Sequence, residues 1–492
     1  MSVAKSLPHD AAKLHVTGTA RYIDDIPTPA GALHLAFGTS EIARGSYQMT
    51  LDAVRAAPGV VAVLTADDLP FANDVSPSVH DEPLLATGTV HYLGQPLFLV
   101  VADSHLNARK AARLGKVDYT AETPILTIEQ ALAANSRFED GPVIWTKGDV
   151  DAAIANAPHQ TRGTLNMGGQ EHFYLEGQAA VALLQEGGDM LVHSSTQHPT
   201  EIQHKVAEAI GVPMHGVRVE VRRMGGGFGG KESQGNALAI ACAVAAQITG
   251  QPCKMRYDRD DDFIITGKRH DFRITYRAGC TADGRLTGVV FEHFVRCGWA
   301  QDLSLPVCDR AMLHADNAYY LPAVRIESHR LRTNTASATA FRGFGGPQGM
   351  VGIERVMDHI AGALGLDPLA VRRANYYNAP GHKGRKRTPY GQKIRDFALH
   401  EMTDQLAQSA DYAARVVAID DWNARNPVLK RGIALTPVKF GISFTLTHLN
   451  QAGALVHVYQ DGSIAMNHGG TEMGQGLFQK VAQVAAARFG DS

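Results

Sequence analysis

Three glycine-rich segments constrain this chain more than any other feature of its sequence. They are Gly225–Gly230, Gly343–Gly349 and Gly469–Gly476. The first follows Val217–Arg222, where apolar and charged residues alternate as in a half-buried strand, and it precedes Ser233–Thr249, which has a helical composition. So many glycines exceed the needs of one tight turn and bring backbone amides close to a ligand. Together the three segments indicate a large, flat, polar cofactor held by several loops.

The first glycine segment also matches part of a phosphate-loop pattern. Gly225, Gly230 and Lys231 satisfy G-x-x-x-x-G-K, but Glu232 stands where a Ser or Thr hydroxyl would meet Mg²⁺. A carboxylate at that position would repel a triphosphate, which argues against a nucleotide hydrolase. A tight turn remains the purely structural alternative. The third segment opens a helix, whose N-terminal amides suit an anion.

Charge and hydropathy argue against two classes of partner. Lys and Arg number 47 against 49 Asp and Glu, for a net charge of −2, and no block of five like charges occurs. No electrostatic signature for nucleic acid or anionic lipid is therefore present. The N-terminus lacks the apolar region of a signal peptide, and the longest apolar run, Ala237–Ala246, is too short to span a membrane. We expect a soluble, cytoplasmic protein.

The cysteines of the chain are odd in number and form no C-x-x-C pair. Their spacing fits neither a zinc site nor a plant-type iron–sulfur set. We therefore interpret all five as reduced thiols of the core: Cys242, Cys253, Cys280, Cys297 and Cys308.

Stretches rich in proline and glycine divide the chain. Short strands alternate with helices between Val16 and Thr123, which indicates an α+β fold class. Thr120–Val150 carries Pro124 and a Gly141–Pro142 pair, and Asn378–Tyr390 mixes Pro and Gly with basic residues, so both are typical of connectors. We predict a domain over residues 1–125, a connector over 126–146, a second domain over 147–377, a linker over 378–395 and a third segment over 396–492.

The third segment contains two recognisable elements. Ala454–Asn467 alternates about Asp461–Gly462, which predicts a hairpin with a type I′ turn. The apolar face formed by Leu477, Val481, Val484 and Phe489 predicts a final helix. Only three residues follow that helix, so we expect the chain to be C-terminally incomplete.

Long stretches of the sequence carry a family resemblance. They are VTGTARYIDD, GQEHFYLEGQ, SSTQHPTEIQHKVA, RRMGGGFGGKE, DRDDDFIITGKRHDF, LPVCDRAMLHADNAYY, TAFRGFGGPQG, KFGISFTLTHLNQAGAL and HGGTEMGQG. Along essentially its whole length the chain resembles the molybdenum-binding part of the xanthine dehydrogenases, in the xanthine oxidase family of molybdenum hydroxylases. The resemblance implies molybdenum bound to molybdopterin, with no side chain ligating the metal directly. It also implies a small hammerhead-type α/β domain and two larger mixed α/β molybdopterin-binding domains, the second only begun here.

The resemblance also implies which residues contact the cofactor. Gln197 follows the predicted strand Met190–Ser194 and precedes a helix from Pro199 to Gly211. In the family the matching glutamine lies beside the metal. The alternative is a purely structural role, in which Gln197 forms hydrogen bonds with the backbone at the start of the helix. The full implied cofactor set is Gln197, Gly227, Phe228, Gly229, Arg342, Gly474 and Gln475.

Glu232 and Arg310 are the implied substrate-binding and catalytic residues. In the family the matching carboxylate and guanidinium bind a purine from two sides and polarise it, and aldehyde oxidases typically lack this pair. A buried Glu or Arg is costly unless paired or liganded. The alternative is therefore that each belongs to a salt bridge, with Asp309 or Lys231 as partner.

Two aromatic residues and a threonine complete the implied substrate site. Phe344 and Phe444 match rings that enclose a flat heterocycle by stacking and by edge contact, and Thr445 adds a hydrogen bond. The alternative for both rings is an ordinary place in the hydrophobic core.

The implied function is the oxidation of hypoxanthine to xanthine and of xanthine to urate, with oxygen from water. The chain has no iron–sulfur cysteine set and no dinucleotide fingerprint, so we expect electrons to pass to a separate small subunit with iron–sulfur clusters and FAD, and then to NAD. A heterotetramer and a cofactor-insertion chaperone are further expected partners. An aldehyde- or other N-heterocycle-oxidising relative and a non-catalytic pterin-binding scaffold remain alternatives.

One part of the family's site has no counterpart in the sequence. The family's general base is a glutamate in a G-E-P-P run, and no such run occurs; Glu82-Pro83 follows Asp81 instead of glycine. We assign no general base and expect this chain to be inactive on its own.

Overall fold

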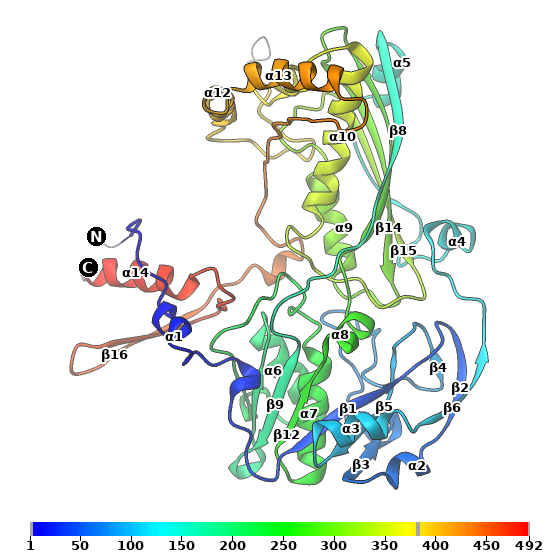
Figure 1. Ribbon diagram of the computed structural model, residues 1–492, viewed down its shortest axis with the longest axis vertical. Helices are drawn as coiled ribbons and strands as arrows, with labels where there is room; N and C mark the ends of the chain where they lie inside the picture. The colour runs from blue at the N-terminus through cyan, green and yellow to red at the C-terminus, as the bar shows by residue number, and fades with distance from the viewer. Residues whose placement is uncertain (1–2, 380–383, 491–492) are drawn as a thin grey trace.

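The computed structural model describes residues 3–379 and 384–490 and has the shape of two stacked bodies with a lateral arm (Figure 1). A seven-stranded sheet lies in the lower body and a long five-stranded sheet in the upper body. The arm carries the last hairpin and the last helix, α14, beside the N-terminal helix α1 (Ala12–Val16). Both helix and strand content agree with the predicted α+β class, which is confirmed.

The seven-stranded sheet joins two distant parts of the chain. Its order is β11-β10-β9-β12-β1-β5-β3, and β1 pairs with β12 in parallel and with β5 in antiparallel fashion. A continuous core of Leu, Val, Ala and Ile side chains unites both parts. The strands are β1 (Leu33–Thr39), β3 (Val60–Leu64), β5 (Pro96–Ala102), β9 (Ala179–Leu184), β10 (Met190–Ser194), β11 (Val217–Glu220) and β12 (Cys253–Arg256).

Helices cover this sheet. The longest, α7, has Ala or another apolar residue at nearly every position, and ten of its residues from Asn236 to Ala246 are buried. A helix that is apolar all round belongs in a core. The helices of this body are α2 (Asp52–Arg55), α3 (His105–Ala112), α6 (Pro199–Ile210), α7 (Asn236–Thr249) and α8 (Arg259–Ile265).

A small three-stranded sheet completes the N-terminal part. Its order is β4-β2-β6, and a separate apolar cluster lies beneath it. The strands are β2 (Gly45–Thr50), β4 (Thr89–Val90) and β6 (Lys116–Ala121).

The upper body is built on the sheet β7-β15-β14-β13-β8, with α9 and α10 on one face and α4 and α5 on the other (Figure 1). β13 and β14 form a hairpin whose turn contains Asp283 and Gly284. The strands are β7 (Val143–Lys147), β8 (His159–Met167), β13 (Asp271–Cys280), β14 (Leu286–Gly298) and β15 (Val324–Arg332). The helices are α4 (Ile128–Ala133), α5 (Val150–Ala155), α9 (Ser304–Leu313), α10 (Gly346–Leu364) and α11 (Pro368–Asn375).

The C-terminal part adds two surface helices and the arm. The predicted hairpin is present as β16 (Ala454–Val458) and β17 (Ile464–His468), and the predicted last helix is α14 (Leu477–Phe489). α12 (Leu399–Ser409) and α13 (Tyr412–Arg425) lie at the top of the upper body.

Several local predictions are confirmed by the fold. β11 occupies most of the alternating segment before the first glycine loop, and α6 runs from Pro199 to the left-handed Gly211. All five cysteines are buried free thiols. The predicted connector 126–146 contains α4 and most of β7, and the domain boundaries stay a prediction.

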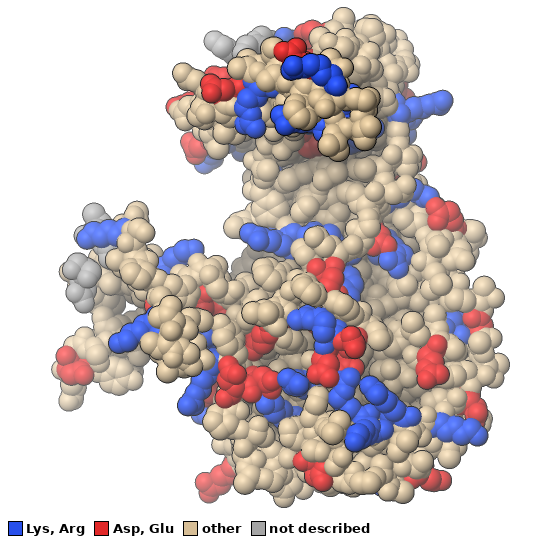
Figure 2. Space-filling view, viewed as in Figure 1, with Lys and Arg blue, Asp and Glu red and all other residues tan. Residues whose placement is uncertain are grey.

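Acidic and basic side chains are interspersed on the face seen in Figure 2, and neither sign forms an extended area there. No helix that the structure describes combines the length and the apolar character that a bilayer crossing needs.

Candidate functional site

The first glycine loop connects β11 to α7 and adopts a conformation that requires its glycines. Gly226 and Gly229 both have φ of +95°, and Phe228 between them has φ of +54°. A Cβ on Gly225 would lie 2.5 Å from the Cβ of Glu176, so this backbone approaches its neighbour too closely for any side chain. The Phe228 ring remains 41% exposed. A large ring held at positive φ and facing outward is typical of a binding loop.

Residues 176–178 hold this loop at both ends. The Glu176 carboxylate accepts a hydrogen bond from the Gly225 amide at 2.8 Å and pairs with the Lys231 ammonium at 3.2 Å. The Gln178 side-chain amide donates to the Gly230 carbonyl at 2.7 Å. Lys231 is fully buried and also donates to the Ser195 hydroxyl at 2.8 Å. The loop is therefore fixed before any ligand binds.

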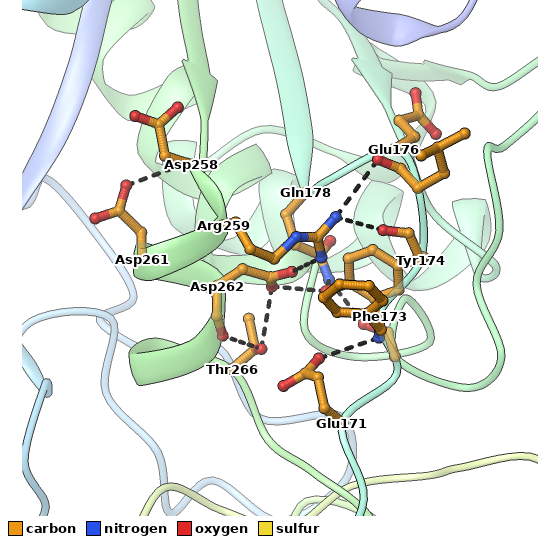
Figure 3. Close-up of polar contacts among 12 residues, drawn as sticks. Glu171, Phe173, Tyr174, Glu176, Gln178, Asp258, Arg259, Asp261, Asp262 and Thr266 are labelled. Carbon is orange, nitrogen blue, oxygen red and sulfur yellow. Dashed lines mark hydrogen bonds and ion pairs between the residues drawn. The ribbon is translucent and has the colours of Figure 1, made fainter.

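A second layer of polar contacts fixes residues 174–178 against α8 (Figure 3). The Tyr174 hydroxyl donates to the buried Asp262 carboxylate at 2.7 Å and accepts from the Gln178 amide at 2.9 Å. Arg259 closes the network through the same carboxylate at 3.2 Å. Burial raises the pKa of Asp262, and the hydrogen bond from Tyr174 opposes this effect. Sequence reasoning did not assign these residues a role; their only signal was their place in the segments GQEHFYLEGQ and DRDDDFIITGKRHDF.

Gln197 bonds the glycine loop from the opposite side. Its side-chain oxygen accepts from the Gly229 amide at 2.8 Å and from the Lys231 amide at 3.4 Å. The backbone amide of Gln197 donates to the Lys231 carbonyl at 2.7 Å. Its side-chain nitrogen has no hydrogen-bond acceptor among residues 3–379 and 384–490. Gln197 thus forms hydrogen bonds with backbone atoms, but these atoms belong to the glycine loop and not to the helix that follows Gln197.

Glu232 is half-buried directly after this loop, at the start of the turn that leads into α7. Its carboxylate has no hydrogen bond or ion pair with any residue of the described part of the chain. Burial, and then the negative charge of Asp302, raise the pKa of Glu232 to about 7, while His198 and Arg310 act in the opposite direction. The surroundings of Glu232 therefore favour its protonated form more strongly than water does.

Arg310 lies on α9 and is 5% exposed. Its terminal nitrogens donate to two backbone carbonyls, to Gly441 at 3.2 Å and to Ser443. Its Nε is buried and has no partner among the described residues. Burial lowers the pKa of Arg310, and Glu232 opposes this effect, so the two charges act on each other.

Neither salt bridge proposed as the alternative is present. Lys231 pairs with Glu176, and Asp309 pairs with the buried Arg330 at 2.6 Å. Glu232 and Arg310 are therefore not explained by local ion pairs with their sequence neighbours.

Two rings stand beside Arg310. The Phe344 and Phe444 ring centroids lie 4.9 Å apart with planes at 48°, and the Arg310 guanidinium carbon lies 5.2 Å from the Phe344 ring centroid. The two rings therefore contact each other directly. The Thr445 hydroxyl donates to the Pro306 carbonyl at 2.7 Å, which fixes this segment to the first turn of α9.

The second glycine segment meets the first. The Arg342 amide donates to the Phe228 carbonyl at 2.9 Å, and the Arg342 side chain is exposed. Part of its glycine content has a packing cause, because a Cβ on Gly345 would lie 2.0 Å from the Val307 carbonyl and one on Gly349 would lie 2.1 Å from that of Ala311. These glycines let α10 pack tightly on α9.

The third glycine segment meets the beginning of the first loop. The Met224 amide donates to the Glu472 carbonyl at 2.8 Å. Gly474 and Gln475 are exposed and bond within their own loop, Gln475 to the Thr471 carbonyl at 2.9 Å. The structure thus brings three glycine segments into one chain of backbone contacts, and leaves Gln475 at the outer end of it.

The site's own side chains do not form a metal cluster. In the described part of the chain, the group close enough to share an ion is His9, Asp10 and Glu472. The Glu472 carboxylate there already accepts backbone amides of Gly474 and Gly476 at 2.8 and 3.1 Å.

Comparison with known domain families gives the class of protein. The family described as "Molybdopterin cofactor-binding domain" matches residues 134–376 and, as a second domain of this description, residues 405–491. The family described as "Aldehyde oxidase and xanthine dehydrogenase, a/b hammerhead domain" matches residues 17–123. Fold and site therefore define a molybdopterin-binding protein with a hammerhead domain.

The chain belongs to the family of the xanthine dehydrogenases and aldehyde oxidases. It is 42% identical over 485 residues to a xanthine dehydrogenase of Drosophila subobscura, covering 98% of this chain and 36% of the relative. It is 41% identical over 488 residues to the xanthine dehydrogenase/oxidase of Mus musculus, covering 98% of this chain and 36% of that protein. The chain thus spans about a third of the length of the curated relatives it matches.

Solved structures of molybdenum hydroxylases share the fold. The quinoline 2-oxidoreductase of Pseudomonas putida 86 superposes with a TM-score of 0.86 at 23% identity, over 99% of this chain and 65% of that one. The aldehyde oxidoreductase of Desulfovibrio gigas superposes with a TM-score of 0.79 at 25% identity, over 94% of this chain and 52% of that one. The predicted hammerhead and molybdopterin-binding architecture is confirmed.

The residues of the glycine loops fit a molybdopterin cofactor. The Gln197 side-chain nitrogen lacks an acceptor in the described part of the chain, Phe228 is exposed at positive φ, and Arg342 presents a free cationic side chain next to it. A pterin offers ring acceptors and a phosphate, which match an amide donor and a cation.

Proposed function

We propose that this chain is the molybdenum-binding, substrate-oxidising part of a purine hydroxylase, which converts hypoxanthine to xanthine and xanthine to urate. The observation that carries the proposal is the pair Glu232 and Arg310. An unpaired carboxylate and a buried guanidinium influence each other's ionisation beside Phe344, directly behind the cofactor loop. Such opposite charges suit the donors and acceptors along a purine edge. The curated relatives named xanthine dehydrogenase support the same substrate class.

In this proposal the loops hold the cofactor and the side chains behind them hold the purine. Bound molybdenum–molybdopterin supplies the oxidation of the substrate and the transfer of an oxygen atom derived from water. The cofactor contacts are those implied by the family resemblance: Gln197, Gly227, Phe228, Gly229, Arg342, Gly474 and Gln475. The electrons pass to a partner subunit with iron–sulfur clusters and FAD, and then to NAD, in a cytoplasmic heterotetramer loaded by a cofactor-insertion chaperone.

The chain's own residues have separate roles in the reaction. Arg310 stabilises negative charge that builds up on the purine carbonyl as the ring carbon is attacked, the electrostatic role that usually contributes most. Glu232, with a pKa raised to about 7, holds a proton or accepts a hydrogen bond according to the purine's tautomer. Phe344, Phe444 and Thr445 shape the pocket around the ring.

A second candidate is the oxidation of aldehydes or other N-heterocycles. Two terminal nitrogens of Arg310 are already bonded to the Gly441 and Ser443 carbonyls, which leaves fewer donors for a purine carbonyl. Similarity to the aldehyde oxidoreductase and the quinoline 2-oxidoreductase supports the same alternative. A non-catalytic pterin-binding scaffold is a third candidate, and absence of turnover in a cofactor-loaded holoenzyme would identify it.

The test uses the purified holoenzyme that contains this chain, assayed with xanthine and with benzaldehyde. We expect Arg310→Met to lower kcat/KM for xanthine by about 30- to 1000-fold, the effect of one charged donor in a dry site at roughly 2–4 kcal/mol. Benzaldehyde oxidation should stay equal or rise, because an aldehyde does not need that donor. Arg373→Met, at a partly exposed arginine of α11 that pairs with Asp404 of α12, is the control and should change neither rate. Equal losses with both substrates would contradict the purine proposal.

A further inference from the structure

We propose that Asp302 is a positioning residue for Glu232, and that the N-terminal part of the chain fixes the purine-binding carboxylate through the loop 299–303 that carries Asp302. This inference rests on the proposed function, because it concerns the same site.

The Asp302 carboxylate is bonded on both oxygens. One oxygen accepts from the Ser233 hydroxyl at 2.6 Å and from the Gln234 amide at 2.8 Å, and the other accepts from the Thr339 hydroxyl at 2.7 Å. Ser233 and Gln234 directly follow Glu232 in the chain, and Asp302 itself is 4% exposed. A charged acceptor with three donors strongly restrains the backbone to which those donors belong. The turn that carries Glu232 is therefore anchored on Asp302.

Asp302 also connects the turn after Glu232 with the segment that begins at Thr339. Thr339 begins the segment that leads into the Phe344 turn, and its amide donates to the Lys268 carbonyl at 2.9 Å. The Gln234 side-chain oxygen accepts from the Gly267 amide at 2.7 Å, while its nitrogen bonds Asp302. The Asp302 carboxylate thus sets the spacing between the turn that carries Glu232 and the segment that leads to Phe344.

The backbone of Asp302 is strained. Its φ is +41°, in the left-handed region that side-chain-bearing residues rarely adopt. Such a conformation persists only where surrounding contacts over-determine it, and it is concentrated at functional sites. At Asp302 the hydrogen bonds to both carboxylate oxygens supply such contacts.

The N-terminal part of the chain holds this loop by hydrogen bonds. The Gln301 amide donates to the Asp81 carboxylate at 2.8 Å. The Ser337 hydroxyl accepts from the Ala300 amide at 3.1 Å and donates to the Glu82 carboxyl at 2.9 Å. Asp81 and Glu82 precede β4, far from Asp302 in the sequence. Asp81 bonds the loop directly at Gln301, and Glu82 reaches Ala300 through Ser337.

Stacking completes the same contact. The Trp299 ring lies between His91, with centroids 3.4 Å apart, and the Arg332 guanidinium, 3.6 Å from its centroid. Arg332 also donates to the Trp299 carbonyl at 2.8 Å. The loop 299–303 is therefore clamped between the N-terminal part and β15, and its position passes through Asp302 to Glu232.

The charge of Asp302 acts on Glu232 as well. Other charged groups that face Glu232 are His198 and Glu201 on α6 and Arg310 on α9. Among these neighbours, Asp302 acts most strongly on the Glu232 carboxyl and raises its pKa; burial raises the pKa of Asp302 itself to about 6. Removal of the Asp302 charge should therefore shift the ionisation of Glu232 to lower pH.

The experiment compares two kinds of variant in the holoenzyme that contains this chain. Asp302→Asn removes the charge, whereas the double variant Ser233→Ala/Thr339→Val keeps the charge and removes two of the three hydrogen bonds. Infrared difference titration follows the protonated carboxyl band that is lost in Glu232→Gln, and steady-state assays give kcat and KM for xanthine. Asp309→Asn, at an ion-paired aspartate on the neighbouring helix, is the matched control.

We expect Asp302→Asn to move the Glu232 titration to lower pH, and the double variant to leave the titration in place while raising KM for xanthine about tenfold with kcat nearly kept. Asp309→Asn should leave both readouts unchanged. An unmoved titration in Asp302→Asn, or an unchanged KM in the double variant, overturns the inference. If Asp302→Asn does not fold, the double variant decides alone.

Failure of this inference is distinct from failure of the proposed function. Wild-type holoenzyme that does not oxidise xanthine refutes the function, while the infrared titration still decides whether Asp302 controls Glu232. Wild-type holoenzyme that oxidises xanthine, with variants that behave like wild type in both readouts, refutes the inference alone.

Discussion

Lys231→Met tests whether the cofactor loop is fixed by its buried ion pair. Lys231 is fully buried, and its ammonium donates to the Glu176 carbonyl at 2.8 Å, to the Glu176 carboxylate at 3.2 Å and to the Ser195 hydroxyl at 2.8 Å. Methionine has a similar volume and no donor, so the substitution removes these bonds without opening a large cavity. The largely buried Glu176 carboxylate then loses the positive charge that compensates it.

The contacts set the size of the expected effect. Removal of one partner of a buried ion pair typically costs about 3–5 kcal/mol. Glu176 keeps hydrogen bonds from the Ser195 hydroxyl, the Gly225 amide and the Ile23 amide, so the lower end of that range, about 3 kcal/mol, applies. At roughly 2–4 °C per kcal/mol for a domain of this size, we expect Tm to fall by about 6–12 °C.

Calorimetry and hydrogen exchange provide the assay. Lys205→Met is the matched control, because Lys205 is also buried and paired, with Asp74 at 2.8 Å, but lies on α6 away from the loop. Both variants should lower Tm, whereas only Lys231→Met should speed amide exchange in residues 225–231 and lower molybdenum content. A Tm within 2 °C of wild type, or equal exchange in both variants, would refute the argument that this pair fixes the loop.

Two further predictions concern pH. Burial, and then the charge of Asp302, raise the pKa of Glu82 to about 8 from its usual 4.5. Between pH 4.5 and about pH 8 the folded protein therefore binds one more proton than the unfolded chain, and the free energy of unfolding falls as pH rises through this range. Glu82→Gln should therefore raise Tm more at about pH 8.5 than at about pH 5. Burial lowers the pKa of His293 to about 3 from 6.5, and among the described residues neither ring nitrogen has a hydrogen-bond partner. The unfolded chain then binds the extra proton as pH falls below 6.5, and His293→Leu should raise Tm at pH 7 and reduce the loss toward pH 4, as calorimetry would measure.

Local elements could be predicted from the sequence because local signals determine them. Alternation gave β11, Pro199 and Gly211 bounded α6, and Asp461–Gly462 fixed the last hairpin. The pairing of β1 with β12 could not be predicted, because it joins residues more than two hundred positions apart. No local pattern specifies which distant strand completes a sheet edge.

The site was predictable in its residue types but not in its contacts. Glu232 and Arg310 came from a family resemblance, and the structure adds that each influences the other's ionisation while Arg310 bonds Gly441 and Ser443. Asp302 carried no signal in the sequence, since a lone aspartate before a helix is indistinguishable from a surface residue. Its burial depends on Trp299 and on the N-terminal part meeting it, which is tertiary information.

Lys231 and Glu232 show why neighbouring charges cannot be assigned by adjacency. In the sequence they form an obvious local pair, yet Lys231 turns into the core and pairs with Glu176, whereas Glu232 forms no ion pair with Lys231 in the described part of the chain. The fold thus satisfies every donor of the buried lysine and leaves the adjacent carboxylate without a hydrogen bond in the described part of the chain.

A half-buried carboxylate without a partner, such as that of Glu232, lowers stability. Since the Ser233 and Gln234 side chains next to it both donate to Asp302, the turn is rigid and the cost is not a consequence of poor packing. Stability given up at a residue in a rigid turn is characteristic of a binding group, and it favours substrate recognition over a structural role for Glu232.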